Sequence, residues 1–362
     1  MKIIFFHLKA HAIFDSRSQA PIGGTLVQMR IVAQKLSENP QNQVSFLVGD
    51  FGQASEEKYG SIIVYRSVNL KRSFLNILKA PILLWRDFNK INAEVYITSS
   101  ASPEVGLLVL FGLIHKKKVI YRVAHKWDCS GEYVSKNGFF GKIFEWGLRH
   151  AYAVVVQTQE QAVLLKERYN LDGIIISNSY SVTKAFTNKN EEILWVSRCE
   201  KWKNPESFLM LAESLPQFKF IMICPKQRYQ EEYHEKIKNQ AYQLKNLCFI
   251  DFVPFDQIQE YFNVAKVFVG TSEYEGFPNT YLQACIGRTP IVSLKVDPDC
   301  FIHENNLGYI AQGDQALLSK FVSRLLQDKS DWTKKSVNAF DYVSKKHDIE
   351  RNISQWEELL SN

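Results

Sequence analysis

Short apolar runs alternate with longer amphipathic segments along the whole chain, and this alternation constrains the fold more than any other sequence feature. Strands of parallel sheets are continuous apolar runs, and the helices that connect them carry one apolar face. The pattern therefore predicts βαβ units in both halves of the chain. The predicted strands are Lys2–Phe6, Gln43–Val48, Ile62–Tyr65, Glu94–Thr98, Lys118–Arg122 and Ala153–Gln157 in the first half, and Ile174–Ile176, Glu192–Val196, Lys219–Ile223, Leu247–Phe252, Lys266–Gly270 and Pro290–Leu294 in the second. The predicted helices include Gly24–Leu36, Pro205–Ser214, Gln230–Tyr242 and Phe255–Asn263.

The length of 362 residues favours two domains over one, since domains usually hold about 100–200 residues. Polar, turn-prone residues place the boundary at about 178–190. We expect a first domain over 1–180 and a second over 181–344, with a C-terminal helix at about 345–362 that packs back on the first. Doubly wound sheets bind ligands at the carboxyl ends of their strands, so two facing sheets predict a site in the cleft between the domains.

The charge is unevenly spread between the halves. The chain carries a formal charge of +6, with +8 on residues 1–180 and −2 on residues 181–362. This asymmetry predicts an anionic partner for the first half, either a membrane surface, a phosphate-bearing substrate or nucleic acid. Nucleic acid is the least favoured, because no helix-turn-helix, zinc-finger or aromatic RNA-binding signature accompanies the basic residues.

Several classes of protein are excluded by what the sequence lacks. The longest uncharged apolar runs, such as Val105–Ile114, fall well short of the ~18–20 residues that span a bilayer. The apolar stretch at Met1–His7 is too short for a signal peptide and predicts a first buried strand instead. The six cysteines form no CxxC pair, which favours reduced thiols over a disulfide framework or a zinc site. We therefore expect a cytoplasmic chain that binds no metal.

The most informative segment runs from Val267 to Pro290. An apolar strand leads into a Gly/Pro turn, Glu275-Gly276-Phe277-Pro278, and a helix is predicted from about Asn279, with Asn279 or Thr280 as its cap. Backbone N–H groups over 279–281, which include that of Tyr281, would suit a diphosphate.

Two polar side chains of this segment, Glu275 and Gln283, could face a ligand across the start of the helix and bind hydroxyl groups. The structural alternative makes Glu275 a solvated loop carboxylate and Gln283 a surface helix residue.

This segment resembles the signature of the retaining family 4 glycosyltransferases, in which Glu, seven residues and Glu occur in an EGFP or EGFG context. Glu275-Gly276-Phe277-Pro278 matches the first half of the signature, and Gln283 stands where the family has its second Glu, assigned to the donor ribose. The resemblance implies the α/β GT-B fold, with two facing Rossmann-like, doubly wound domains, and implies no metal or cofactor besides the nucleotide diphosphate sugar. Glutamine keeps a hydrogen-bond acceptor but loses the charge.

Other segments agree with the resemblance. Arg198, with Lys203 five residues later, resembles the family's pair of cations that contact the donor diphosphate, and Lys201 is a less favoured substitute. His125 follows a strand and resembles the family's active-site histidine, which faces the sugar. Asn178 resembles the family's asparagine after a strand and is interpreted as structural. Solvated loop cations and a surface histidine are the alternatives.

Three further motifs carry less information. Gly23-Gly24 opens a predicted helix, so backbone N–H groups there could face an anion, but a plain turn explains it equally well. Asp297-Pro298-Asp299 has the DxD form of a metal motif, and we interpret it as a turn. Ile221–Pro225 lacks the Gly-rich strand end of the family and leaves the nucleobase pocket, for UDP or GDP, undefined.

The sequence thus predicts a retaining, metal-independent glycosyltransferase of the hexosyltransferase type. The resemblance implies that Arg198 and Lys203 neutralise the diphosphate while Glu275 and Gln283 hold sugar and ribose hydroxyls. The partners are a nucleotide-sugar donor and a glycan or lipid-linked glycan acceptor, which suits cell-surface polysaccharide or glycolipid synthesis. Two alternatives stay open: a nucleotide-sugar epimerase of the same fold, and a catalytically silent sugar- or nucleotide-binding module.

A basic amphipathic segment over residues 69–90 suggests where such an enzyme would work. Its apolar residues recur at helical spacing, and Lys79 and Arg86 belong to a set of five cations that outnumbers the single Asp87. Such a segment can lie on the anionic inner face of a membrane, with peripheral binding. The alternative is a helix packed on the first sheet with solvated cations, and Pro81 argues against one straight helix.

Overall fold

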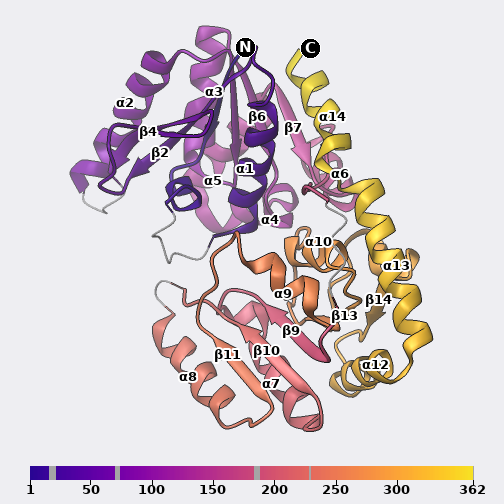
Figure 1. The fold of residues 1–362 in the computed structure, drawn as a ribbon. Coiled ribbons are helices and arrows are strands. Elements are labelled where there is room, and N and C mark those ends of the chain that lie inside the picture. The colour runs from indigo at the N-terminus through magenta and orange to yellow at the C-terminus, as the bar shows by residue number, and fades with distance from the viewer. Residues whose placement is uncertain (16–21, 70–73, 183–187, 228–229, 362) are drawn as a thin grey trace. The chain divides into compact units, whose positions relative to one another are not determined.

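The computed structural model describes residues 1–15, 22–69, 74–182, 188–227 and 230–361, and contacts divide the chain into two compact units. Unit 1 holds the described residues up to Ser179 together with those from Ile349 onward, and unit 2 runs from Tyr180 to Asp348. Figure 1 shows the yellow C-terminal helix back among the elements of unit 1.

Unit 1 is built on an eight-stranded sheet of order β3-β4-β2-β1-β5-β6-β7-β8. Every pair is parallel except β3 and β4, which run antiparallel at one edge. Alternate residues of each strand point to opposite faces, so both faces are apolar and both are covered. The strands are β1 (Lys2–Phe6), β2 (Gln43–Asp50), β3 (Glu56–Tyr59), β4 (Ile62–Asn69), β5 (Val95–Ser99), β6 (Lys118–Arg122), β7 (Ala153–Val156) and β8 (Ile174–Ile175).

Helices cover the two faces of this sheet. On one face Ile3 and Phe5 of β1 share a core with α1 and with Trp356 of α14. On the other face Ile4 and Phe6 share a core with α2, α3, α5 and α6. The helices are η1 (Ala10–Ile13), α1 (Gly24–Leu36), α2 (Phe74–Ile91), α3 (Pro103–His115), α4 (Lys126–Ser130), α5 (Glu132–His150), α6 (Gln159–Tyr169) and α14 (Ile349–Ser361).

Unit 2 is built on a six-stranded, wholly parallel sheet of order β11-β10-β9-β12-β13-β14. Its core includes Trp195, Phe208 and Phe220, which are fully buried. The strands are β9 (Glu192–Val196), β10 (Lys219–Ile223), β11 (Leu247–Ile250), β12 (Val267–Gly270), β13 (Ile291–Ser293) and β14 (Gly308–Ile310). The helices are η2 (Lys201–Lys203), α7 (Pro205–Ser214), α8 (Glu231–Tyr242), α9 (Ile258–Val264), α10 (Asn279–Ile286), η3 (Pro298–Cys300), α11 (Phe301–Glu304), α12 (Gln315–Gln327) and α13 (Lys329–Lys346).

The predicted α/β class with two doubly wound parallel sheets is confirmed. Two details of the prediction are wrong. The run Ile174–Ile176, assigned to the second half, supplies β8 at the edge of the first sheet. Strands β3 and β14 were not predicted, because β3 is a charged edge strand and β14 has only three residues. Helix α2 continues through Pro81 over 18 residues. No described helix is long and apolar enough to cross a membrane.

Candidate active site

The loops that follow β9 and β12 meet because these two strands pair in parallel. Backbone N–H of Glu273 donates to the carbonyl of Trp202 over 2.9 Å. The Thr271 hydroxyl donates to the carbonyl of Lys203 over 2.7 Å and accepts from Nε1 of the buried Trp195 over 2.8 Å. The two loops therefore form one bonded layer at the carboxyl edge of the sheet, where doubly wound folds bind ligands.

Lys203 and Glu275, which lie 72 residues apart in the chain, form an ion pair within this layer. Their side chains are only 12% and 13% exposed. The Ser272 hydroxyl donates to the same carboxylate oxygen over 2.7 Å, and the Lys203 ammonium lies 3.9 Å from the centre of the Trp202 ring. Burial lowers the pKa of Lys203 although Glu275 opposes the shift. The solvated-loop alternative is therefore wrong for both residues.

Arg198 is also paired. Its guanidinium lies 3.2 Å from the carboxylate of Glu200, which accepts a further hydrogen bond of 2.8 Å from Gln227. The Arg198 side chain keeps 32% of its surface exposed, whereas that of Glu200 keeps 15%. Both predicted cations thus have carboxylate partners, and the four charged groups sum to a formal charge of zero. Lys201 is exposed, with its ammonium 6.0 Å from the Tyr233 ring.

Helix α10 begins where the sequence predicts, but its cap differs. Pro278 occupies the N-cap position in extended conformation and no side chain caps the helix, so the prediction of Asn279 or Thr280 as the cap is wrong. Proline lacks an N–H and fixes its own φ, which suits the residue before a helix start. The N–H of Tyr281 already donates to the carbonyl of Pro278 over 3.1 Å. One of the three N–H groups predicted to face the diphosphate is therefore already bonded within the helix start.

The remaining residues of the motif hold the loop in place. The Phe277 ring packs against Phe301 and His347, with centroids 4.9 and 5.1 Å apart, and Gly276 precedes it in the turn. The buried Tyr281 hydroxyl donates to Ser293 over 2.9 Å.

Gln283 is buried, with 6% exposure, on the second turn of α10. The surface-helix alternative is therefore wrong for this residue. Within the described chain its side-chain amide makes no hydrogen bond, and its backbone carbonyl accepts one from Gln259. A buried amide of this kind can serve a ligand with both donors and acceptors.

His125 lies in unit 1, at the N-cap of α4, which follows β6. Its Nδ1 accepts the N–H of Trp127 over 3.3 Å, which assigns a ring proton to Nε2. Asp128 fixes the same turn: its carboxylate accepts from the N–H of Ala124 over 2.8 Å, from the N–H of His125 over 3.3 Å and from Tyr121 Oη over 2.8 Å. Burial raises the pKa of Asp128 to about 6.

Asp128 was not among the predicted residues. Its signal in the sequence is its position three residues after His125, which is where the acidic residue of a capping box stands.

Gly23 and Gly24 also lie in unit 1, at the start of α1. Gly23 is the extended N-cap residue and Gly24 the first helical residue, as predicted, and a Cβ added to Gly23 would meet nothing within 4 Å. Asn178 accepts a hydrogen bond from the buried Arg122, which supports its structural interpretation. The remaining site candidates, Arg198, Lys203 and those of the 275–283 segment, belong to unit 2.

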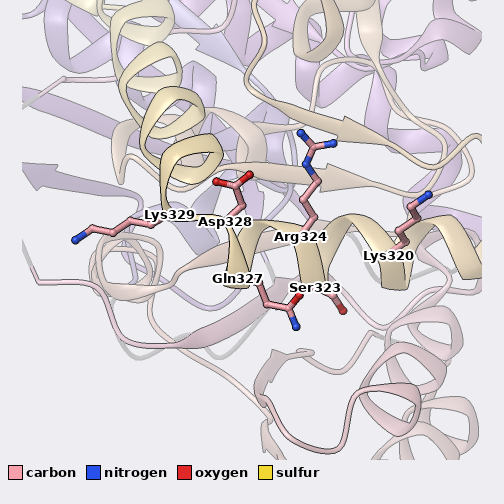
Figure 2. Close-up of a pocket in the computed structure, with 6 residues that line it drawn as sticks. All are labelled: Lys320, Ser323, Arg324, Gln327, Asp328 and Lys329. Atoms are coloured by element: carbon pink, nitrogen blue, oxygen red, sulfur yellow. The ribbon is translucent and has the colours of Figure 1, made fainter.

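Two other features of unit 2 lie outside the bonded layer. Asp297 accepts backbone N–H groups of Ile302 over 2.8 Å and His303 over 3.2 Å, which is the turn predicted for the DxD sequence. The described residues contain no group of three or more His, Cys, Asp or Glu that could hold a metal ion. A pocket of about 580 Å³ is lined by residues of α12 and the start of α13, and Figure 2 shows side chains such as Arg324 and Gln327 leaving opposite sides of the helix. They do not converge on a common point.

Residues 179–347 match the family model Glycosyl transferases group 1. No curated protein sequence matches the chain.

Solved structures share the fold over nearly their whole length. Sucrose-phosphate synthase (tll1590) from Thermosynechococcus elongatus has a TM-score of 0.80 at 14% identity, with 99% of this chain and 98% of that chain covered. Anabaena Alr3699/HepE, in complex with UDP-glucose, has a TM-score of 0.73 at 16% identity, with 100% and 99% covered. A mutant of TarM from S. aureus, in complex with fondaparinux, alpha-GlcNAc-glycerol and UDP, has a TM-score of 0.74 at 13% identity, with 100% of both chains covered. These likenesses show the GT-B fold.

Proposed function

Residues 179–347 carry a Glycosyl transferases group 1 domain, and from this premise we propose that the protein is a retaining glycosyltransferase of the family 4 type. It transfers a hexose from a nucleotide diphosphate sugar to a glycan or lipid-linked glycan acceptor, in cell-surface polysaccharide or glycolipid synthesis on the cytoplasmic side of the membrane. Unit 2 binds the donor and unit 1 binds the acceptor. The transfer requires no metal. The observation that carries the proposal is the buried Lys203–Glu275 pair, beside Arg198, at the strand ends of the matched domain.

The charged cluster supplies what a diphosphate leaving group requires. As the glycosidic bond breaks, negative charge develops on the phosphate, and preorganised cations stabilise it. Arg198 and Lys203 provide these cations, while the N–H groups at the start of α10 provide further donors. A diphosphate competes with Glu200 for Arg198 and with Glu275 for Lys203. We propose that this exchange turns Glu275 toward the sugar hydroxyls.

Three more steps complete the proposed reaction. Gln283 binds the ribose hydroxyls through its buried amide. His125 donates from Nε2 to the sugar and does not act as the nucleophile. The acceptor hydroxyl attacks the anomeric carbon on the face that the phosphate leaves, and its proton passes to the departing phosphate oxygen. A trapped covalent glycosyl-enzyme would contradict this last step.

A UDP-sugar is the donor we propose, because UDP occurs in the solved complexes of Anabaena HepE and S. aureus TarM. The test measures the thermal shift of the protein with UDP, GDP and ADP. A ligand at ~100 times its dissociation constant stabilises the folded state by ~2.7 kcal/mol, which makes binding visible.

Two variants make this test specific. Arg198→Ala should abolish most of the UDP shift and lower kcat/KM by about 10²-fold, whereas the matched control Lys201→Ala should leave both close to wild type. The proposal is overturned if none of the three nucleotides stabilises the protein, or if the two variants behave alike. Turnover of UDP-glucose without any acceptor would instead indicate the epimerase.

A further inference from the structure

Arg122, the last residue of β6, places a guanidinium group in the interior of unit 1, where only 3% of the residue is exposed. Its Nη2 donates to the amide oxygen of Asn178, whereas its Nε and Nη1 are buried without a hydrogen-bond partner in the described chain. Burial lowers the pKa of Arg122 to about 10, and no acidic residue of the described chain opposes this shift. The guanidinium therefore keeps its positive charge at neutral pH and is bonded only to a neutral oxygen.

Another arginine of unit 1 shows how such a group is usually satisfied. Arg149 of α5 keeps 40% of its side chain exposed, yet all three of its guanidinium nitrogens are bonded. Its Nε and Nη2 donate to the carboxylate of Glu145 over 3.2 and 2.9 Å, and its Nη1 donates to the carbonyl of Tyr169 over 2.8 Å. Buried charges without a counter-ion are costly, and unsatisfied buried donors are rare. The two unbonded nitrogens of Arg122 therefore point to a partner from outside the chain.

Strand β6 brings this guanidinium to the edge of the sheet where ligands bind. The strand lies between β5 and β7, and its Ile120 belongs to the core beneath α1 and α14. Residues two apart in a strand share a face, so Arg122 leaves that same face at the carboxyl end, which is the ligand-binding end of doubly wound sheets. Residues 124–127 keep part of their surface exposed, and two residues of chain span at most ~7 Å. An anion therefore reaches Arg122 without crossing the core.

The surroundings of Arg122 are fixed by buried hydrogen bonds. The Ser99 hydroxyl donates to the carbonyl of Arg122 over 2.6 Å. Asn178 precedes Ser179, which exchanges two hydrogen bonds with Gln28 of α1: its N–H donates to Oε1 over 2.8 Å, and Nε2 donates to its carbonyl over 3.1 Å. The guanidinium is thus held at both ends before any ligand binds, which lowers the entropic cost of binding.

We propose that Arg122 binds an anionic group of the acceptor, either a phosphate or a carboxylate. A guanidinium forms strong, charge-assisted hydrogen bonds with both groups. Because Asn178 contributes no charge, one anionic group neutralises the site. His125, which we propose to contact the transferred sugar, follows Arg122 by three residues. The assignment to the acceptor rests on the proposed function. The charge of residues 1–180 predicts an anionic partner without locating it, and Arg122 gives that partner a position.

The test measures the thermal unfolding of the full chain with inorganic phosphate or with acetate, against sodium chloride at equal ionic strength. The Arg198→Ala background removes the contribution of that cation in unit 2. At about ten times its dissociation constant, the anion should raise Tm by roughly 3–6 °C. Arg122→Met should abolish this shift without lowering the Tm of the anion-free protein, because it removes a buried charge that has no counter-ion.

Two further variants make the result specific to this guanidinium. Asn178→Asp places a carboxylate against Arg122 with little change of shape, so it should compete with the added anion and abolish the shift while the arginine is kept. Arg149→Met is the matched control, since it makes the same substitution elsewhere in unit 1, and it should keep the full shift. The proposal is overturned if neither anion raises Tm in the background protein, or if Arg122→Met and Arg149→Met respond alike.

Calorimetry with UDP identifies which substrate supplies the anion. With Arg198 intact, Arg122→Met should bind UDP within about twofold of the wild-type affinity. A loss of about tenfold or more would assign the anion to the donor diphosphate and overturn the assignment to the acceptor. The phosphate and acetate titrations need no nucleotide, so their failure is distinguishable from failure of the UDP test of the proposed function.

Discussion

The buried Lys203–Glu275 pair should behave as a single energetic unit, and a double-mutant cycle can measure this. The substitutions are Lys203→Met and Glu275→Gln, which keep the approximate volume of each side chain while removing its charge. Both side chains are about seven-eighths buried, so each single variant leaves one uncompensated buried charge. Breaking such a pair costs ~3–5 kcal/mol, whereas replacing both partners is often close to neutral.

We expect each single variant to lose about 3 kcal/mol and the double variant to lose no more than either one, which gives a coupling of about 3 kcal/mol. For a unit of this size the single variants would lower Tm by roughly 6–12 °C. The assay is urea unfolding followed by the fluorescence of the seven tryptophans, of which Trp195, Trp202 and Trp332 lie in unit 2. Additive losses in the double variant would refute the coupling.

The wild type and the Lys203→Met variant also allow a test of how stability depends on pH. Because burial lowers the pKa of Lys203 below its ordinary 10.5, the unfolded chain holds that proton more tightly than the folded one. Below the pKa of Lys203 in the folded chain, the folded state bears the free-energy cost of a buried, protonated lysine. As pH rises from that pKa towards 10.5, the folded chain loses the proton and this cost disappears. Wild-type protein should therefore gain stability over this alkaline window relative to Lys203→Met. Parallel curves for the two proteins would contradict the assigned cause.

The remaining predictions concern other positions. Burial raises the pKa of Asp128 to about 6, so the folded chain binds this proton more tightly than the unfolded chain does. As pH rises from 4 to 6, the free energy of unfolding of the wild type should therefore fall by about 3 kcal/mol relative to that of Asp128→Asn, as measured by unfolding at each pH. Glu200→Gln should strengthen UDP binding several-fold by releasing Arg198, as measured by calorimetry. Gln283→Ala should weaken UDP binding by ~0.5–1.5 kcal/mol while Gln283→Glu preserves it, and unchanged affinity in both would remove the ribose role. Gly308→Ala should cost at least about 3 kcal/mol in denaturant unfolding, because its Cβ would lie 1.7 Å from the carbonyl oxygen of Ile291.

Strand positions could be predicted from the sequence where burial alone determines them. The bounds of β1, β6, β9 and β10 are confirmed residue for residue, since each is an apolar run buried on both faces. The short strands β8 and β14 carry too few residues to show which sheet they join. Their places depend on pairing across the sheet, which no local pattern encodes.

The sequence predicts Arg198, Lys203 and Glu275 as residues of one ligand site, but it does not predict how these residues pair. It could not show that Lys203 pairs with Glu275, because that contact depends on the parallel register of β9 and β12. Asp128 was missed for a related reason: its role is to accept backbone N–H groups of its own turn, and an isolated acidic residue after a strand gives only a weak signal.

The return of the chain to unit 1 at Ile349 has a consequence for biosynthesis. Ile349, Ile353, Trp356, Leu359 and Leu360 complete the core beneath α1, yet a ribosome makes them only after the whole of unit 2. Unit 2 can close first, because all of its strands emerge earlier and its ends, Tyr180 and Asp348, lie side by side in a β-bridge. Until then, one face of the sheet of unit 1 is covered by α1 but lacks the apolar residues of α14. Chains stalled or clipped near residue 348 should therefore keep unit 2 folded and leave unit 1 prone to aggregation, which gives quality-control proteases a way to recognise them.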